Sequence, residues 1–338
     1  MKIVIDAFGG DNSPNEIVYG TIDAINERQG FNAVLVGKQE IIEEILSTLS
    51  YDKSRVEIVD ASDVITCEEE PVMAIRRKPD SSICKALKIM NEDEDAKVFV
   101  SAGSTGAVLA GSTLKLGRIA GINRPALCPI LPTAKDGKNV LLLDAGANAD
   151  CKAINLCQFA VMGSEYAKLL GVEEPKVALL SNGTEDEKGN ALCHEVFPLL
   201  KETKNINFVG NVEARDLLTG DYDVVVADGF SGNVALKSTE GAVKLLFGQL
   251  KGCINSSLKS KIGGLLLKKS MYGLKDKLDY DKKGGAIFIG LKKTVIKAHG
   301  SSKRQAFKCA VLQADDYAKL DIVNSIAKMV AQTTEIQG

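Results

Sequence analysis

The chain has 338 residues, of which 45% are hydrophobic and 25% charged, and its formal net charge is −2. This balance is ordinary for a folded globular protein, and the length predicts one large α/β domain or two interlocked lobes rather than extended disorder. Aromatic residues make up only 5% of the chain and tryptophan is absent, so a base-stacking platform for nucleic acid is not expected.

The N-terminal and cysteine patterns favour a cytoplasmic protein. The chain opens directly into the strand-like segment KIVIDA, without the signature of a signal peptide, and it contains no run of 18 apolar residues. The eight cysteines are scattered and form no CxxC pair, which argues against a zinc site or a disulfide framework. We therefore expect free thiols in a reducing compartment.

Nine short apolar segments are predicted to be β-strands, and helical patterns lie between most of them. Several are continuous apolar runs, which is typical of strands covered on both faces. The alternation of strands and helices predicts a mostly parallel sheet in an α/β/α arrangement. The predicted strands are 2–6, 33–37, 55–59, 97–101, 139–144, 176–181, 206–210, 223–228 and 294–298.

The first helix carries clear boundary signals. Ser13 can cap it, Pro14 suits its first turn, and Glu16 would complete a Ser-x-x-Glu capping box. Gly30 follows the last apolar turn and is expected to end the helix.

A basic, amphipathic segment at residues 240–280 is predicted to form a helical hairpin. Apolar residues recur every four positions from 246 to 262, and the pair Gly263 and Gly264 predicts the break between two helices. Residues 244–283 contain ten lysines and three aspartates. This local charge indicates contact with an acidic partner or an anionic surface.

Six of the predicted strands end in small, hydroxylated or glycine-rich turns. In open parallel sheets, ligands bind at the carboxyl ends of strands, where glycine lets them approach the backbone. The turn Gly103-Ser104-Thr105-Gly106 is the best candidate for a phosphate cradle, because a helix starts there. It matches neither a Walker loop nor a GxGxxG fingerprint, so nucleotide binding is not expected. The other five turns are 7–11, 145–148, 182–185, 229–233 and 299–302.

Three side-chain patterns could carry chemistry, and each also has a structural explanation. His299, one of two histidines, could contact a ligand or bond a carbonyl at a strand end. Lys188 could neutralise a phosphate oxygen or lie on a solvated loop. The basic segment 75–82 could dock an acidic partner or be an ordinary surface.

Neither a metal cluster nor a cysteine nucleophile is expected. Aspartates at positions 6, 11, 144 and 228 follow strands, where a carboxylate commonly caps the next turn. Cys193 and His194 are adjacent on a predicted helix, where neighbouring side chains do not face each other.

The chain resembles the PlsX family, the acyl-ACP:phosphate acyltransferases of bacterial phospholipid synthesis, over residues 1 to about 320. The resemblance implies a homodimer of two-lobed subunits, with residues 1–338 forming one intertwined α/β unit similar to phosphotransacetylases and isocitrate/isopropylmalate dehydrogenases. It implies reversible conversion of acyl-ACP and orthophosphate into acyl phosphate and acyl carrier protein (ACP), without a cofactor. The acyl phosphate would pass to a membrane glycerol-3-phosphate acyltransferase. The motifs are DAFGGD, IRRKPDSS, SAGSTGA, LLLDAGANADC, GTEDEKGN, VVVADGFSGNVALKSTEG, KGGA and VIKAHGSS.

This reaction assigns provisional roles to the candidate residues. Orthophosphate is itself the nucleophile, so the protein must position it and stabilise the oxyanion that develops. We expect the turn Gly103-Ser104-Thr105-Gly106 to hold phosphate and Lys188 to neutralise it. We expect His299 to donate to the oxyanion or to protonate the leaving thiolate, with Asn233 as a further catalytic candidate. The substrate cleft is expected to include Asp6, Gly9, Gly10, Asp11, Asn148, Thr184 and Asp228.

The motifs depart from the usual family pattern at four positions. Phe8 stands in place of methionine, Asn12 of histidine, Ser104 of asparagine and Ile287 of proline. A role that needs an imidazole at position 12 cannot be filled here, whereas Asn12 and Ser104 can still hydrogen-bond an oxygen.

Alternatives remain at two levels. The protein could be a phosphotransacetylase that uses acyl-CoA, or a non-catalytic regulator that binds an anion. The 240–280 segment could contact ACP, an anionic membrane or the second subunit of a dimer. Its apolar stripe favours the membrane, so we expect peripheral membrane association.

Overall fold

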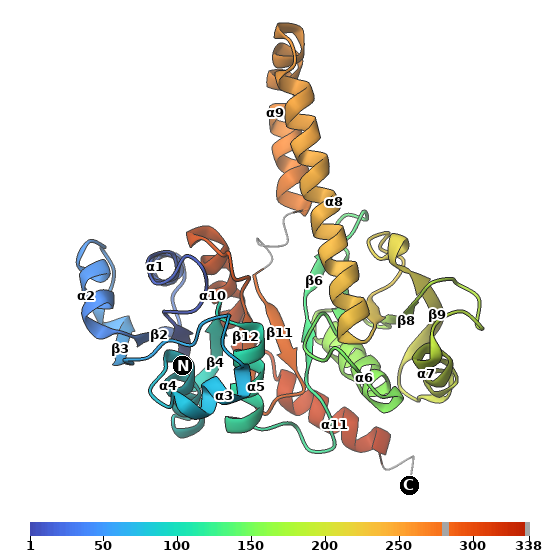
Figure 1. Cartoon of the computed structure of the whole chain (residues 1–338), viewed down its shortest axis with the longest axis horizontal. Coiled ribbons are helices and arrows are strands. Elements are labelled where there is room, and N and C mark those ends of the chain that lie inside the picture. Colours follow the sequence, from blue (N-terminus) through green and yellow to red (C-terminus); the bar gives the residue numbers. More distant parts are fainter. Residues whose placement is uncertain (279–283, 335–338) are drawn as a thin grey trace.

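The computed structural model describes residues 1–278 and 284–334, which form two β-sheets flanked by helices, with a helical hairpin extending away from them (Figure 1). The predicted α/β architecture with mostly parallel sheets is confirmed. Residues 279 and 280 of the predicted 240–280 hairpin and Lys283 of the KGGA motif lie outside the described residues.

The first sheet has the strand order β3-β2-β1-β4-β12-β11-β5. Its neighbours are parallel, except that β11 runs antiparallel to both β12 and β5. At its centre, Ile3 of β1 is paired with Ala33 on one side and with Val98 on the other. The strands are β1 (Lys2–Asp6), β2 (Asn32–Gly37), β3 (Val56–Asp60), β4 (Ala96–Ser101), β5 (Ala126–Cys128), β11 (Ala286–Ile289) and β12 (Thr294–Lys297).

The second sheet has the strand order β6-β7-β10-β8-β9, with β6 antiparallel to β7 and the other pairs parallel. Its strands are β6 (Ile130–Pro132), β7 (Asn139–Leu143), β8 (Lys176–Ser181), β9 (Asn207–Glu213) and β10 (Val224–Val226).

Strand alternation places different side chains against the helices on the two faces of the first sheet. Ile3 and Leu35 belong to a core that includes Phe307 of α10 (Arg304–Lys319), whereas Val4 and Phe99 face α4 and α5. The remaining helices are α1 (Asn15–Glu27), α2 (Gln39–Ser47), α3 (Pro71–Arg77), α4 (Ser82–Glu92), α5 (Thr105–Lys115), α6 (Ala153–Leu169), α7 (Ala191–Glu202), α8 (Gly229–Asn255), α9 (Leu258–Leu278) and α11 (Ile322–Thr334).

One hydrophobic core is continuous between the two sheets. Leu141 of β7 and Val224 of β10 belong to the same buried cluster as Ile3, and Ile326 of α11 joins them. The opposite face of the second sheet packs Val225 against Ala235 of α8. Packing across both sheets therefore fixes the position of α8 relative to the first sheet.

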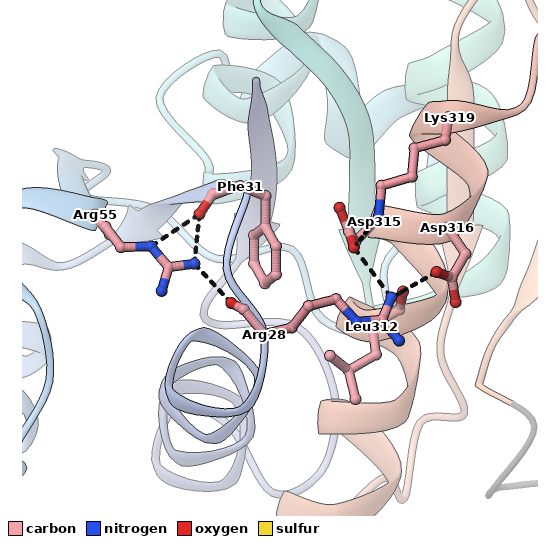
Figure 2. Close-up of polar contacts among 7 residues, drawn as sticks. All are labelled: Arg28, Phe31, Arg55, Leu312, Asp315, Asp316 and Lys319. Atoms are coloured by element: carbon pink, nitrogen blue, oxygen red, sulfur yellow. Dashed lines mark hydrogen bonds and ion pairs between the residues drawn. The ribbon is translucent and has the colours of Figure 1, made fainter.

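Arg55 stabilises the end of α1. Its guanidinium is buried and donates to the carbonyl oxygens of Ile25 at 2.6 Å, Arg28 at 2.8 Å and Phe31 at 2.8 Å. The last carbonyls of a helix lack intrahelical partners, so the bonds to Ile25 and to the C-cap residue Arg28 satisfy two of them, and the bond to Phe31 holds the segment that follows. Figure 2 shows the contacts to Arg28 and Phe31.

Arg28 connects this end of α1 to α10 (Figure 2). Its guanidinium pairs with the buried carboxylate of Asp315 at 3.0 Å and with Asp316, and Lys319 pairs with Asp315 at 2.6 Å. These ion pairs hold the helix that follows the predicted 299–302 turn against the first sheet.

The predicted capping box at the first helix is wrong. Pro14 rather than Ser13 is the N-cap residue, and the Ser13 hydroxyl donates to the carbonyl of Gly10 at 2.8 Å. The Glu16 carboxylate accepts from the backbone N–H of Arg304 at 2.6 Å, so it serves a tertiary contact. Gly30 follows the helix with φ +104°, a conformation that favours glycine.

The predicted hairpin is present, but its break is not where the sequence indicated. α8 ends at Asn255 and α9 begins at Leu258, so Gly263 and Gly264 lie inside α9. The two helices contact each other and extend side by side away from the sheets (Figure 1). Lys277 of α9 forms an ion pair with Asp136, near the base of the hairpin. Within the described residues, no helix combines the length and hydrophobicity needed to cross a membrane.

Candidate functional site

The carboxyl ends of β1, β4 and β12 bring three of the predicted turns together. They meet where the strand order of the first sheet reverses, with β2 and β3 on one side of β1 and β4 on the other. The backbone N–H of Asp11 donates to the carbonyl of Gly300 at 2.8 Å. A Cβ on Gly9 would lie 2.6 Å from the backbone nitrogen of Gly103, so the first two turns touch because glycine occupies position 9.

Asp6 and Asn12 hold these turns in place. The buried Asp6 carboxylate accepts from the Ser101 hydroxyl at 2.6 Å, and that hydroxyl accepts from the backbone N–H of Gly103 at 3.0 Å. Burial raises the pKa of Asp6, and the Ser101 hydrogen bond opposes that shift. The Asn12 amide donates to the carbonyl of Ser301 at 3.0 Å. Both side chains therefore position backbone next to the candidate site.

A cavity of about 350 Å³ lies beside these turns and is lined by segments from both sheets. Thr105, Asn233 and His299, which the sequence singled out, line it together. Its lining combines polar and cationic side chains with apolar ones. The lining comprises Thr105, Leu127, Pro129, Ile130, Leu131, Ala145, Gly146, Asn233, Leu236, Lys237, Glu240, Gly284, Gly285, Ala286, Lys297, Ala298, His299 and Gly300.

The first turns of α8 supply one wall. Asn233 packs against Gly146, where an added Cβ would lie 3.4 Å from the Asn233 amide carbon and where φ is +125°. Lys237 and Glu240 follow one and two turns later on the same face and form an ion pair at 2.8 Å. The sequence interpretation missed this pair, although its helical spacing from Asn233 is a signal that points to it.

Asp144 and Asn148 shape the turn after β7 without lining the cavity. The buried Asp144 carboxylate accepts from the backbone N–H of Gly146 at 3.1 Å and of Asn148 at 2.7 Å, and from the Asn148 amide at 2.8 Å. Burial raises the pKa of Asp144, and these donors oppose the shift. Asn148, predicted to lie in the substrate cleft, thus acts through the backbone.

His299 is exposed at the mouth of the cavity and is oriented by its own turn. Its Nδ1 accepts from the backbone N–H of Ser301 at 3.2 Å and lies 2.8 Å from the Ser301 hydroxyl. Because Nδ1 is an acceptor here, the neutral ring carries its proton on Nε2. Lys237 Nζ lies 3.5 Å from Nε2. The ring can therefore present an N–H donor on the cavity side.

Lys297, the last residue of β12, is a cavity residue that the sequence interpretation missed. Its side chain is 8% exposed, and its ammonium donates to the carbonyls of Ala102 at 3.2 Å and of Ala298. Burial lowers its pKa from 10.5 to about 8. A lysine at the end of an apolar strand, two residues before His299, was the available signal.

Lys188, Thr184 and Asp228 lie apart from this cavity. Lys188 and Thr184 are exposed on the turn after β8, and Asp228 caps α8 by accepting from the backbone N–H of Ser231 at 2.8 Å. Asp228 and part of the β8–α7 turn border a second cavity of about 680 Å³, on another side of α8. The other lining residues of this cavity are Leu180, Ser181, Asn182, Gly189, Asn190, Cys193, Ala214, Arg215, Phe230, Ser231, Val234, Ala235, Ser238, Thr239 and Ala242.

Burial raises the pKa of Cys193, which suits a structural thiol rather than a nucleophile. In the part of the chain that the structure describes, no three His, Cys, Asp or Glu side chains are grouped so that they could hold a metal ion.

Solved structures with the same fold include enzymes that handle phosphate. A phosphotransacetylase from Streptococcus pyogenes aligns with a TM-score of 0.61 and 17% identity, covering 98% of this chain and 94% of that chain. A 4-hydroxythreonine-4-phosphate dehydrogenase from Klebsiella pneumoniae aligns with a TM-score of 0.53 and 14% identity, covering 94% and 99%. At these identities the likeness shows the fold alone.

Sequence relatives are far more similar. A phosphate acyltransferase from Clostridium tetani is 48% identical over 329 residues, which cover 96% of this chain and 97% of the relative. One from Bacillus cereus is 48% identical over 331 residues, with 98% of each chain covered. A family model described as "Fatty acid synthesis protein" matches residues 1–325. The chain is thus an acyltransferase and belongs to the PlsX family of phosphate acyltransferases.

Proposed function

We propose that the protein transfers the acyl group of acyl-ACP to orthophosphate, reversibly forming acyl phosphate and ACP. The observation that carries this proposal is the 350 Å³ cavity, whose lining combines polar and cationic side chains with apolar ones. Thr105, Lys297 and His299 offer donors and positive charge to an anion. Leu127, Ile130, Leu131 and Leu236 offer an apolar surface to the first carbons of an acyl chain.

The reaction needs positioning rather than an enzyme nucleophile. An oxygen of phosphate attacks the thioester carbon, the carbon–sulfur bond breaks, and the leaving thiolate takes a proton. The Gly103-Ser104-Thr105-Gly106 turn, at the start of α5, holds the phosphate through Thr105, which lines the cavity, and through backbone N–H groups other than that of Gly103, which is bonded to Ser101. His299 donates its Nε2 proton to the developing oxyanion or to the thiolate, and Asn233 orients the substrate from the facing wall.

The hairpin of α8 and α9 is proposed to rest on an anionic membrane. Lysines 251, 259, 261, 268 and 269 are exposed among its apolar side chains, a combination that suits the headgroup region of a bilayer. Since α8 begins at the cavity, one helix would connect the site of synthesis to that surface. Beyond residue 240, its exposed large apolar side chains are Leu245, Leu246, Leu258, Ile262, Leu265, Leu266, Leu267, Tyr272 and Leu274.

The proposed partners follow from the same reaction. An acidic carrier protein delivers the acyl chain, and a membrane glycerol-3-phosphate acyltransferase consumes the product. We also propose a homodimer, as the family resemblance implies. The cytoplasmic, peripherally membrane-associated location predicted from the sequence belongs to this proposal.

Incorporation of labelled phosphate into organic-extractable acyl phosphate tests the activity. Acyl-ACP is expected to support it with a kcat/KM at least about tenfold above that of acyl-CoA of the same chain length. An equal or greater rate with acyl-CoA would reject ACP as the carrier. Absence of phosphate-dependent product with both thioesters would reject the transfer reaction and leave an anion-binding regulator.

A further inference from the structure

A phosphate dianion in the cavity requires a positive charge nearby, and three lysines are candidates for it. Lys188, the sequence-based candidate, is exposed on a turn outside the cavity lining. Lys237 lines the cavity, but its side chain is 51% exposed and is already paired with Glu240 at 2.8 Å. Lys297 lines the cavity from its buried end.

Lys297 is fixed directly behind the proposed phosphate cradle. β12 is paired in parallel with β4, with Lys297 opposite Ser101. The ammonium donates to the carbonyl of Ala102 at 3.2 Å, and Ala102 immediately precedes Gly103 of the cradle. Its second bond goes to the carbonyl of Ala298, next to His299. Two strand ends that border the cavity thus hold the same side chain.

The charge of Lys297 lacks a direct counter-ion. An ammonium has three N–H donors, and within residues 1–278 and 284–334 the recorded acceptors are the two carbonyls, with no carboxylate in ion-pair contact. The carboxylates of Asp6 and Asp11 attract the ammonium without contacting it. Burying a charge without an opposite charge in contact is unfavourable, and binding an anion relieves that cost. This free-energy balance distinguishes Lys297 from Lys237.

We propose that Lys297 binds the orthophosphate substrate, donating its remaining N–H to a phosphate oxygen at the Gly103-Ser104-Thr105-Gly106 turn. This assignment rests on the proposed transfer to phosphate. It replaces Lys188 as the residue that neutralises the nucleophile. By holding phosphate between Thr105 and His299, Lys297 places it beside the imidazole that donates to the developing oxyanion.

Lys297→Met tests the assignment, because methionine has similar length but no charge. Its phosphate KM is expected to rise at least about tenfold, while the KM for acyl-ACP stays within about twofold. Lys188→Met is the matched control and is expected to leave both constants unchanged. An unchanged phosphate KM in an active Lys297→Met enzyme would overturn the assignment.

Binding without turnover separates this inference from the proposed function. Inorganic phosphate is expected to raise the melting temperature of the wild type and of Lys188→Met, but not that of Lys297→Met or Lys297→Gln. Equal phosphate stabilisation of a Lys297 variant would overturn the inference even if no acyl phosphate is ever formed. If the wild type makes acyl phosphate and the Lys297 variants retain its phosphate KM, the function stands and the inference fails.

The pH profile of the wild type supplies a test that does not depend on a folded Lys297 variant. Burial lowers the pKa of Lys297 to about 8, so kcat/KM for phosphate is expected to fall above that pH, where orthophosphate stays a dianion. Asp6, Asp11, Cys67 and Lys237 act electrostatically on Lys297, and His299 lies nearby. The fall is expected to persist in Cys67→Ser and Lys237→Met. A flat profile from pH 7.5 to 9.5, or loss of the fall in either control, would overturn the assignment.

Discussion

His299 has one ring nitrogen bonded to its own turn and the other on the side of Lys237. The backbone N–H of Ser301 donates to Nδ1 at 3.2 Å, while Nε2 points toward the side of Lys237. A donor that acts on the developing charge affects kcat more than KM. The 299–302 turn thus favours the ring tautomer that the proposed role of His299 requires.

His299→Ala is therefore expected to lower kcat at least about tenfold, which corresponds to about 1.4 kcal/mol of transition-state stabilisation. The KM values for phosphate and acyl-ACP are expected to change less than about threefold. Steady-state kinetics at saturating phosphate measure this. A kcat within threefold of the wild type would mean that the imidazole only satisfies its own turn.

Lys297 also makes a pH-dependent contribution to stability. Its pKa is about 8 when folded and 10.5 when exposed, so the unfolded chain binds more protons between these values. The unfavourable burial of charge is fully present below pH 8 and is relieved as the pH rises to 10.5. In phosphate-free urea titrations, the free energy of unfolding of the wild type is therefore expected to rise relative to that of Lys297→Met across this interval. The rise is on the order of 3 kcal/mol at most.

The matched control for this titration is Lys188→Met, because Lys188 is exposed. Its difference from the wild type is expected to stay constant with pH. A constant difference for Lys297→Met as well would show that the ammonium is not desolvated in the folded protein.

Single residues were predictable where backbone geometry limits the choice of side chain. Gly9 and Gly103 are in close contact, and His299 lies between the small residues Ala298 and Gly300 at a strand end. These positions therefore carried a signal in the sequence. Lys297 carried only the signal of its place at the end of an apolar strand, since lysine is usually exposed and its burial arises only when β12 inserts between β4 and β11.

At the scale of elements, α8 is in close backbone contact with the turn that follows β7. A Cβ on Gly232 would lie 2.0 Å from the carbonyl oxygen of Asp144, the residue that holds the 145–148 turn. Asn233, Lys237 and the apolar Leu236 enter the cavity from this helix. The distance between α8 and the turn therefore sets the width of the cavity.

Gly232→Ala is expected to lower both the free energy of unfolding, by about 1–3 kcal/mol, and the acyltransferase rate, because a backbone carbonyl cannot move as a side chain can. Gly241→Ala on the same helix is the control, since nothing lies within 4 Å of its added Cβ. It is expected to be neutral or to stabilise α8 by up to about 1 kcal/mol. Equal stability and activity of the two variants would argue against a close contact at Gly232.

Elements with a strong periodic pattern were predictable, and their ends were not. The nine predicted strands are all present, whereas β5, β6 and β11 were missed because three-residue strands around Pro129 and a short strand after Gly285 give little periodicity. The hairpin turn lies at residues 256 and 257 rather than at Gly263 and Gly264. Glycine is tolerated inside a helix when packing compensates, and Gly264 lies against Ile254 of the neighbouring helix.

At the scale of the whole molecule, the sequence predicted turns that would converge but not which sheet each strand would join. Turns that follow β1, β4 and β12 meet because these strands are neighbours in the first sheet. The turn after β8 lies apart because β10 inserts between β7 and β8, which separates Lys188 from the cavity. Strand order depends on long-range pairing, which periodicity and turn chemistry do not encode.

The hairpin gives the whole molecule one surface of distinct character. Leu265 and Leu266 are 70% and 81% exposed at positions followed closely by Lys268 and Lys269. Exposed apolar side chains beside lysines bind an anionic bilayer by combining burial with charge attraction. A dimer interface formed by the same face would instead depend on the leucines and only weakly on the charge of the lysines.

Lys268→Glu combined with Lys269→Glu is therefore expected to lower co-flotation with anionic vesicles at least about tenfold, since each lysine near such a surface contributes about 1 kcal/mol. The doubly substituted control Lys38→Glu with Lys204→Glu makes the same change in net charge on exposed residues outside the hairpin and should float like the wild type. Leu265→Ser with Leu266→Ser should also lose flotation while keeping phosphate-dependent turnover of soluble acyl-ACP. If charge reversal at 268 and 269 leaves flotation intact, while the leucine substitutions dissociate a dimer in sedimentation, the hairpin joins subunits rather than resting on a membrane.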